Sequence, residues 1–401
     1  MSLSEQLTDA IAAQNALTQA VAGKMGQIDG RVEQFVSQWG IDGYTTLEVG
    51  AGKQFGSIQD AWNSLIGKTL KADVLIKVAD GVYTTNGVIL THQPFAHRIH
   101  IEGNIGNPAA CQIKFVPDTN GASHGVMFDN VLKVGFSGFK LIGEATDQNW
   151  THRSLLIQQG SRVWSWPGSV QIEGGPVGLH VEHGSQYDCS DLHISNTRQW
   201  GAYIGSGSRA YLGGLRLIGP GKDVQTTVPA RFNNGVERTT MAYGLVVADA
   251  AQCWTGNAHI TDWNVGTHVG QNGYIWCDSV KIKRCDIGCY AGHGGICWSA
   301  LPGTVEQRAT IVDARFGFLA DHGGKIVVNH AIVEQCESGF VAAQHSQILA
   351  NQSIARNCVR GYESHGQSTV QAYGATPSEC QIDYTPPNPD VPGNANAIIR
   401  R

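Results

Sequence analysis

Residues 244–265 read GLVVADAAQCWTGNAHITDWNV, and residues 266–287 read GTHVGQNGYIWCDSVKIKRCDI. The two blocks are equal in length and begin with glycine, and the next glycine of the series is Gly288. A second run, with the same spacing, consists of Gly317, Gly339 and Gly361. A fixed internal period of this kind is typical of proteins that stack one structural unit on the next.

The remaining glycines of the series fit the same unit with loops added. The step from Gly178 to Gly201 is one residue longer, and the wider gap between Gly288 and Gly317 allows one coil with a short loop. The segment from Gly201 to Gly244 holds either two coils or one coil with a long polar loop. We favour a loop at Lys222–Thr240, because KDVQTTVPARFNNGVERTT has no strand alternation.

Apolar residues alternate within each unit in three short stretches. In the first stretch the apolar residues lie one and three positions after the glycine, as in Leu245 and Val247. In the second stretch they lie nine and eleven positions after it, and in the third fourteen and sixteen positions after it. A period of two sends one face of a strand inward. Because one coil cannot bury its inner face alone, neighbouring coils must stack, about 4.8 Å apart. The sequence therefore predicts an all-β fold, a right-handed parallel β-helix with about 22 residues per coil.

Residues 1–40 follow a different period, in which mostly apolar residues recur alternately four and three positions apart. The series is Leu7, Ile11, Gln14, Thr18, Val21, Met25, Ile28, Val32 and Phe35, of which Gln14 and Thr18 are polar. This spacing predicts an N-terminal α-helical coiled coil over residues 1–40, and the alternative is one amphipathic helix packed on the following domain. We predict a β-helix over residues 41–376 with a capping helix near 56–66, and a Pro-rich extended tail over 377–401.

Composition excludes several classes of protein. With 42% hydrophobic and 15% charged residues the chain is not disordered, and no apolar run reaches the roughly 18–20 residues that membrane insertion needs. A net charge of −5 without basic clusters argues against nucleic acid as a partner. The missing signal-peptide pattern and the irregular spacing of the ten cysteines favour an intracellular origin. No spacing of ligands predicts a metal site, and no motif predicts a cofactor.

The segment Val49–Asn104 contains three informative stretches, VGAGKQFGSIQDAWNSL, VLIKVADGVYTTN and RIHIEGN. Together they resemble the first coils of the pectin-lyase-like superfamily, especially those of pectinesterases. The catalytic Gln-Asp-Thr-Leu and Asp-Phe-x-Phe-Gly motifs of pectinesterases are missing, and Gln59 and Asp60 fall in the expected capping helix. The resemblance therefore implies the fold and not that activity.

A predicted coiled coil, ALTQAVAGKMGQIDGRV, precedes coils such as GFVAAQHSQILANQSIARNC. This order is similar to that of bacteriophage tail fibre and tailspike proteins. The resemblance implies a homotrimer in the virion, assembled in the host cytoplasm and joined through its N-terminus to other phage tail or baseplate proteins. It also implies adsorption to a bacterial surface polysaccharide or another receptor.

An outward position, ten places after the glycine, is aromatic on several coils, at Tyr211, Trp254, Trp276 and Trp298. We expect this stripe to be buried between subunits or to stack on sugar rings, and we favour the subunit interface. A second aromatic set, Trp150, Trp164 and Trp166, falls in a stretch that we expect to be irregular. This set suits either carbohydrate binding or the packing of loops.

Asp286 and Glu337 occupy the same position of their repeats, two coils apart and so about 9–10 Å from each other. This separation suits the carboxyl pair of an inverting glycosidase, although acidic residues near turns are mostly solvated. His293 and His322 are expected to be neighbours that are solvated rather than bound to metal. The leading functional prediction is host-surface recognition and adsorption by a phage fibre, and the sequence leaves open whether this fibre is also an enzyme. The alternatives are a polysaccharide depolymerase, either a glycoside hydrolase or a lyase, and a purely structural appendage.

Overall fold

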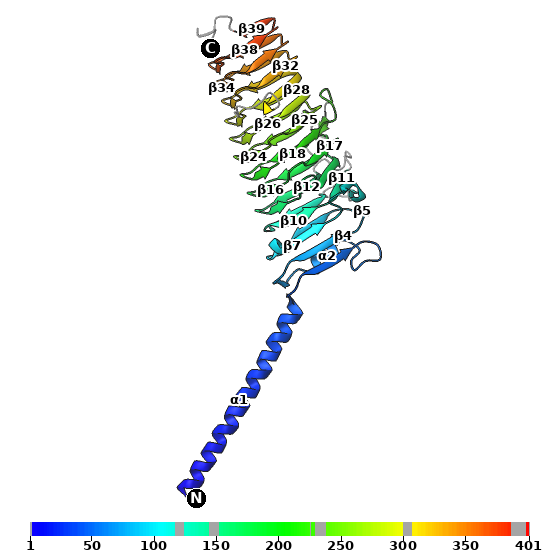
Figure 1. Cartoon of the computed structure of the whole chain (residues 1–401), viewed down its shortest axis with the longest axis vertical. Coiled ribbons are helices and arrows are strands. Elements are labelled where there is room, and N and C mark those ends of the chain that lie inside the picture. The colour runs from blue at the N-terminus through cyan, green and yellow to red at the C-terminus, as the bar shows by residue number, and fades with distance from the viewer. Residues whose placement is uncertain are drawn as a thin grey trace.

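The computed structural model describes residues 2–116, 124–143, 152–224, 226–228, 238–299, 307–385 and 398–400. The chain forms one long helix followed by an elongated solenoid of parallel strands (Figure 1). Helix α1 (Leu3–Trp39) projects from the N-terminal end of the solenoid, and the short strands β1 (Gly40–Ile41) and β3 (Thr69–Leu70) pair beside its base. In the described part of the chain no helix is both long and apolar enough to cross a lipid bilayer.

Three ribbons of parallel strands build the solenoid. The first ribbon consists of β2 (Thr45–Val49), β4 (Val74–Val78), β7 (Ile99–Glu102), β10 (Val134–Ser137), β13 (Arg162–Trp164), β16 (Gln186–Asp188), β19 (Arg209–Tyr211), β24 (Gln252–Trp254), β27 (Tyr274–Trp276), β29 (Ile296–Trp298), β31 (Lys325–Val327), β34 (Gln347–Leu349), β37 (Thr369–Gln371) and β40 (Ile398–Arg400). The second ribbon consists of β5 (Gly81–Thr85), β8 (Cys111–Phe115), β11 (Phe139–Gly143), β14 (Val170–Gly174), β17 (His193–Ser195), β20 (Arg216–Ile218), β25 (His259–Thr261), β28 (Lys281–Ala291), β30 (Thr310–Ala320), β32 (Ile332–Glu334), β35 (Ile354–Arg356) and β38 (Thr376–Ser378). The third ribbon shares β28 and β30 and also contains β6 (Val88–Thr91), β9 (Val126–Asp129), β12 (Arg153–Gln158), β15 (Val177–Val181), β18 (Trp200–Ile204), β23 (Tyr243–Val247), β26 (Val265–Val269), β33 (Ser338–Ala342), β36 (Arg360–Ser364) and β39 (Ile382–Thr385). The result is an all-β, largely parallel, β-helix-like fold with three strands per coil.

The strand register follows the glycine repeat of the sequence. Leu245 pairs with Thr267, and Thr267 pairs with Cys289. Cys289 then pairs with Phe318, so the wider gap before Gly317 holds one coil and an added loop. Ala202 pairs with Leu245, so the long segment before Gly244 also holds a single coil with an insertion.

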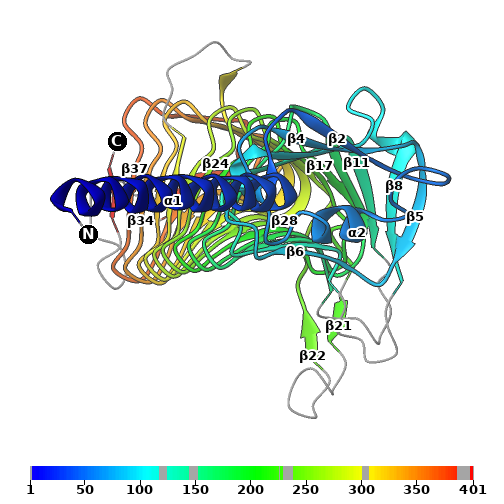
Figure 2. The ribbon, with the colours of Figure 1, turned by 90° about the horizontal axis from the view of Figure 1, so that it is seen from below.

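The insertion contains two short strands, which the sequence analysis did not predict. Strands β21 (Thr226–Val228) and β22 (Arg238–Thr240) form an antiparallel pair that stands away from the solenoid in Figure 2. Both strands are rich in β-branched residues, which favour extended backbone without requiring a buried face. A search for alternating apolar residues therefore missed them.

The glycines of the repeat allow the backbones of successive coils to approach closely. A Cβ atom added at Gly244 would lie 2.5 Å from the carbonyl oxygen of Gly266, and one added at Gly266 would lie 2.6 Å from that of Gly288. Neither glycine has a left-handed φ, so the requirement is steric contact rather than backbone conformation. The periodic signal in the sequence thus marks the points where neighbouring coils touch.

Both ends of the solenoid differ in detail from the predicted boundaries. Helix α2 (Ile58–Asn63) lies inside the range expected for the cap, is capped by the Ser57 hydroxyl, and buries Trp62, whose indole N–H donates to the Thr91 carbonyl. At the other end, β38, β39 and β40 continue the three ribbons beyond residue 376, so that boundary is corrected. Pro377 suggested that the strands had ended, but it lies in β38. Among the described residues β38 pairs only with β35, so it is an edge strand, where proline is tolerated.

The interior is filled by apolar side chains in register. Phe318, Phe340, Tyr362 and Tyr384 stack on successive coils with centroids 4.9–5.4 Å apart. Cys285, Cys336 and Cys358 share one position of their repeats and are at most 3% exposed, so they act as small packing residues.

A partly buried histidine makes stability depend on pH. His268 on β26 packs against Tyr243 and Tyr290, with ring centroids 5.3 and 5.0 Å away, and burial lowers its pKa to about 4. The folded-state pKa is below that of the unfolded chain, so the unfolded state binds the proton more tightly and stability falls as the pH drops from about 6.5 to 4. We expect His268→Gln to remove about 2–3 kcal/mol of this pH dependence, measured by urea unfolding at pH 7 and pH 4.5. The exposed His345→Gln is the control, and an unchanged pH dependence in His268→Gln would contradict the assignment.

Candidate functional site

Strand pairing aligns one outward position along the outer face of the first ribbon. This outer column contains Trp164, Asp188, Tyr211, Trp254, Trp276 and Trp298 on consecutive coils. Trp164 therefore lies on a regular strand, β13, and not in the irregular stretch that the sequence analysis expected. Trp166 follows this strand and is 47% exposed, whereas Trp150 lies outside the described residues.

The first three rings of the aromatic ladder, defined as Tyr211, Trp254, Trp276 and Trp298, stack on one another. Tyr211 and Trp254 have centroids 4.5 Å apart and planes 9° apart, and Trp254 and Trp276 have centroids 4.3 Å apart and planes 5° apart. Their ring faces are used within the ladder, so mainly ring edges remain for contact with other molecules. The two ends of the ladder, Tyr211 and Trp298, are 40% and 38% exposed. Stacking on a sugar requires an open ring face, which the interior of the ladder does not offer.

Trp164 is positioned differently, because its neighbours in the column are not indole rings. The preceding coil contributes Gly135, where an added Cβ would lie 2.6 Å from His100 and 2.9 Å from Trp164. This gap lets Trp164 and His100 meet with centroids 4.8 Å apart. The edge of Trp166 meets Trp164 at 89°, with centroids 5.2 Å apart. On the following coil the column contains Asp188, so a carboxyl group, and not a ring, lies between Trp164 and the aromatic ladder.

A groove of about 660 Å³ opens beside this tryptophan. The Trp164 groove, as we call it, is lined by His97, Lys133, Arg162, Val163, Trp164, Gln186 and Asp188. The Gln186 amide donates to both carboxylate oxygens of Asp188, at 3.2 and 3.0 Å. Partial burial raises the pKa of Asp188, while the amide of Gln186 opposes that shift. An aromatic ring beside amide, carboxyl and cationic groups is typical of sites that orient a polar ligand.

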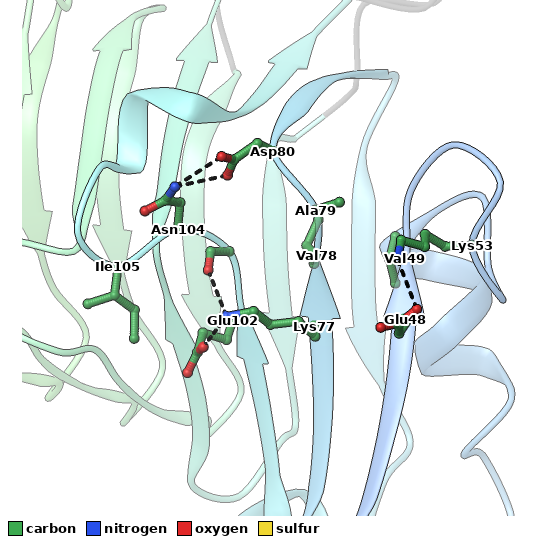
Figure 3. Close-up of a pocket in the computed structure, with 11 residues that line it drawn as sticks. Glu48, Val49, Lys53, Lys77, Val78, Ala79, Asp80, Glu102, Asn104 and Ile105 are labelled. Atoms are coloured by element: carbon green, nitrogen blue, oxygen red, sulfur yellow. Dashed lines mark hydrogen bonds and ion pairs between the residues drawn. The ribbon is translucent and has the colours of Figure 1, made fainter.

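Two smaller cavities lie near the same end of the ribbon. One of about 310 Å³ shares His97 and Trp164 with the groove. The other, of about 370 Å³, is lined by charged residues that pair with one another, as Figure 3 shows. Its pairs are Lys53 with Glu48 at 3.1 Å, Lys77 with Glu102, and Asn104 with Asp80 at 3.0 Å. Because both of its lysines are already paired with glutamates, this cavity offers a ligand less positive charge than the Trp164 groove.

Asp286 and Glu337 lie at the predicted register, but an arginine lies between them. The pairing of β28 with β30 and of β30 with β33 places Asp286, Arg315 and Glu337 on three successive coils. The Arg315 guanidinium is 2.9 Å from the Asp286 carboxylate, and Glu337 faces Arg360 at 3.8 Å. This is the arrangement of a surface charge ladder, and the catalytic role stays a prediction.

A buried polar cluster on the third ribbon was not predicted. Arg153 Nε donates to His180 Nδ1 at 2.6 Å, and His180 Nε2 lies 3.1 Å from Glu182. The Tyr203 ring packs against His180 at a tilt, with centroids 4.6 Å apart, and its hydroxyl donates to Asp249 at 3.0 Å. His180 is 3% exposed, whereas Tyr203 is half-buried and Asp249 is exposed, so the network runs from a covered histidine to the surface. Burial of His180 lowers its pKa, and its hydrogen bond lowers that of Glu182.

The histidines considered for metal binding, His293 and His322, are exposed neighbours with centroids 4.9 Å apart. Within the described residues there is no group of three or more His, Cys, Asp or Glu side chains that fits a metal ion.

Comparison with known proteins gives little beyond these observations. No family model matches the chain, and no curated protein matches it. Among solved structures, the Agl-KA catalytic domain superposes with a TM-score of 0.43 and 11% sequence identity, over 80% of this chain and 62% of that one. The present chain thus spans less than two thirds of the length of that domain, and a likeness this distant indicates no activity.

Proposed function

We propose that this chain is the subunit of a homotrimeric fibre of the bacteriophage tail fibre or tailspike type, which attaches a virion to a bacterial surface. The observation that best supports the proposal is the apolar seam of α1. Six seam residues, all large and apolar, are 51–63% exposed in the single chain: Leu7, Ile11, Val21, Met25, Ile28 and Val32. A soluble monomer seldom leaves a continuous stripe of this kind uncovered.

Two further copies of the same chain are the proposed occupants of this seam. The alternating spacing of four and three keeps the stripe facing a partner along a left-handed coiled coil. Heptad register puts Ile11, Thr18 and Val32 at a positions and Val21 and Ile28 at d positions. β-Branched residues at both a and d favour three or more strands over two. In this proposal the solenoid is a right-handed parallel β-helix, and the N-terminus docks on other tail or baseplate proteins.

The aromatic ladder is proposed as a second contact between subunits. Its exposed ring edges form an apolar strip that another subunit would cover. We expect Trp276→Asp to dissociate the trimer or weaken it strongly, because a charge would then be placed in an apolar contact. Light scattering measures the mass. A fully folded Trp276→Asp trimer of unchanged mass would refute this interface.

Recognition of the host is assigned in this proposal to a surface polysaccharide bound at the Trp164 groove. The test is binding of the full chain to immobilised capsular polysaccharides and lipopolysaccharides, with Trp164→Ala as the variant. We expect at least one of these glycans to be retained by the unaltered protein and lost in the variant. A stable trimer that retains none of them would instead support a purely structural appendage. The virion location and assembly in the host cytoplasm belong to the same proposal, which includes no nucleic acid partner and no membrane insertion.

A second candidate function is a polysaccharide depolymerase, favoured by Asp188. This half-buried carboxyl group lies in the groove beside Trp164, and its pKa is raised, as general acids of glycosidases require. Enzymatic cleavage would release new reducing ends from a bound glycan, and Asp188→Asn would abolish that release while binding persists. Release of no reducing ends from any bound glycan would remove this candidate.

A further inference from the structure

We infer that the Trp164 groove recognises an acidic polysaccharide, with a sugar ring on Trp164 and its acid groups on Lys133 and Arg162. This inference rests on the proposed glycan recognition and specifies the class of glycan. The acid group is a carboxylate, sulfate or phosphate ester, since the three share the chemistry that a lysine and an arginine recognise.

The two cations are adjacent on neighbouring coils. Lys133 lies at a left-handed bend immediately before β10, and Arg162 begins β13 on the next coil, so the two cations lie on neighbouring coils of the same ribbon. Both side chains are exposed and line the groove. Neither forms an ion pair or a side-chain hydrogen bond with any residue that the structure describes. Their positive charges are therefore available to a ligand, unlike Lys53 and Lys77 in the neighbouring cavity, which are paired with glutamates.

The cations form part of a line that runs along the fibre. Strand register extends the column of Arg162 to Gln186 and Arg209 on the C-terminal side. Arg209 is exposed. A polymer with repeated acid groups that lies along this column would meet a cation or an amide on each successive coil. The geometry therefore suits an extended polyanion better than a single small anion.

Trp164 supplies what a plain anion site lacks. The ring stands in the column next to the cations, with Asp188 rather than another ring on its C-terminal side. Burial lowers the pKa of His100, whose ring packs against Trp164, so that side chain is uncharged at neutral pH. Gln186 and Asp188 offer an amide and a carboxyl group to sugar hydroxyls. A carboxyl group beside the ring favours a polymer in which neutral hydroxyls alternate with acid groups over the closely charged backbone of a nucleic acid.

The test measures binding of the full chain to polysaccharides by biolayer interferometry. The acidic probes are polygalacturonate, alginate, hyaluronan, dextran sulfate and a wall teichoic acid, and the neutral probes are dextran, mannan and methyl-esterified polygalacturonate. The test variant carries Lys133→Gln and Arg162→Gln. The matched control is Lys325→Gln, which removes a cation at the same register of the same ribbon, several coils away.

We expect at least one acidic polysaccharide to bind more tightly than every neutral one, including the methyl ester that differs only in charge. The double variant is expected to lose about tenfold or more of that affinity, and to show a weaker salt dependence, while Lys325→Gln binds normally. Both altered side chains are exposed, so the melting temperature of the double variant should be unchanged. Measuring it checks that the double variant is folded.

Three outcomes would overturn the inference, and they separate it from the proposed function. Binding of neutral glycans that is equal to that of acidic ones, and unaffected in the double variant, refutes acid recognition but leaves glycan recognition standing. Binding of no glycan at all by a folded protein refutes both. The third outcome is that single-stranded DNA binds more tightly than every acidic polysaccharide and that the double variant loses this binding. The two cations would then be assigned to a nucleic acid instead.

Discussion

Replacing Gly266 with alanine is expected to lower the free energy of unfolding by about 3 kcal/mol, at the upper end of what overpacking costs. The new methyl group would lie 2.6 Å from the Gly288 carbonyl oxygen and 2.8 Å from the Ile282 side chain. The carbonyl belongs to the next coil, so relief requires two coils to move apart and break their ladder of hydrogen bonds. Chemical unfolding followed by circular dichroism measures the change.

The matched control is Gly256→Ala, in the preceding repeat. A Cβ at Gly256 meets no atom within 4 Å, and its φ lies outside the left-handed region. We expect this variant to unfold within about 0.5 kcal/mol of the unaltered protein. Equal stabilities of the two variants would mean that the glycine series does not mark contacts between coils.

Charging the seam of α1 is expected to convert the trimer into monomers. Val21 and Ile28 are 51% and 58% exposed in the single chain and occupy d positions of the proposed coiled coil. Glutamates at both positions would bring six like charges to the trimer axis and remove its apolar contact. Light scattering should then report the mass of a single chain, 43.0 kDa, instead of three times that mass.

The control for this experiment is Ala16→Glu, on the face of α1 opposite the seam, at an f position that faces solvent in a coiled coil. It adds one charge without touching the proposed contact, so the mass should stay that of a trimer. An unaltered protein that is monomeric at micromolar concentration would contradict the proposal outright. If the trimer persists with both glutamates, the contact between subunits must lie on the solenoid instead.

The periodicity predicted the solenoid because one physical requirement recurs on every coil. Gly244, Gly266 and Gly288 repeat where backbones touch, and inward apolar positions repeat where the core is filled. Insertions obey no such requirement, so the strands at Thr226–Val228 and Arg238–Thr240 left no apolar alternation to detect. The edge strand containing Pro377 was missed because proline reads as the end of a strand unless its position at an edge is known.

The candidate site was only half visible in the sequence. Trp164 was recognised in the sequence as a candidate for carbohydrate binding, but Lys133, Gln186 and Asp188 were not grouped with it. The coils before Gly178 vary in length. For example, the step from Val126 to its partner Leu155 is longer than the step from Leu155 to its partner Leu179. Without a constant period, the sequence did not show that Gln186 follows Arg162 and that Asp188 follows Trp164 on the next coil. Strand register, which the structure supplies, places these residues in two adjacent columns of the first ribbon.

A density map of the purified full-length protein by electron cryomicroscopy tests the central claim most directly. The account predicts three parallel chains related by a three-fold axis along α1, with Gly244, Gly266 and Gly288 in line and about 4.8 Å between successive coils. A map that shows a lone chain, or helices that fold back onto their own solenoids, would contradict the account.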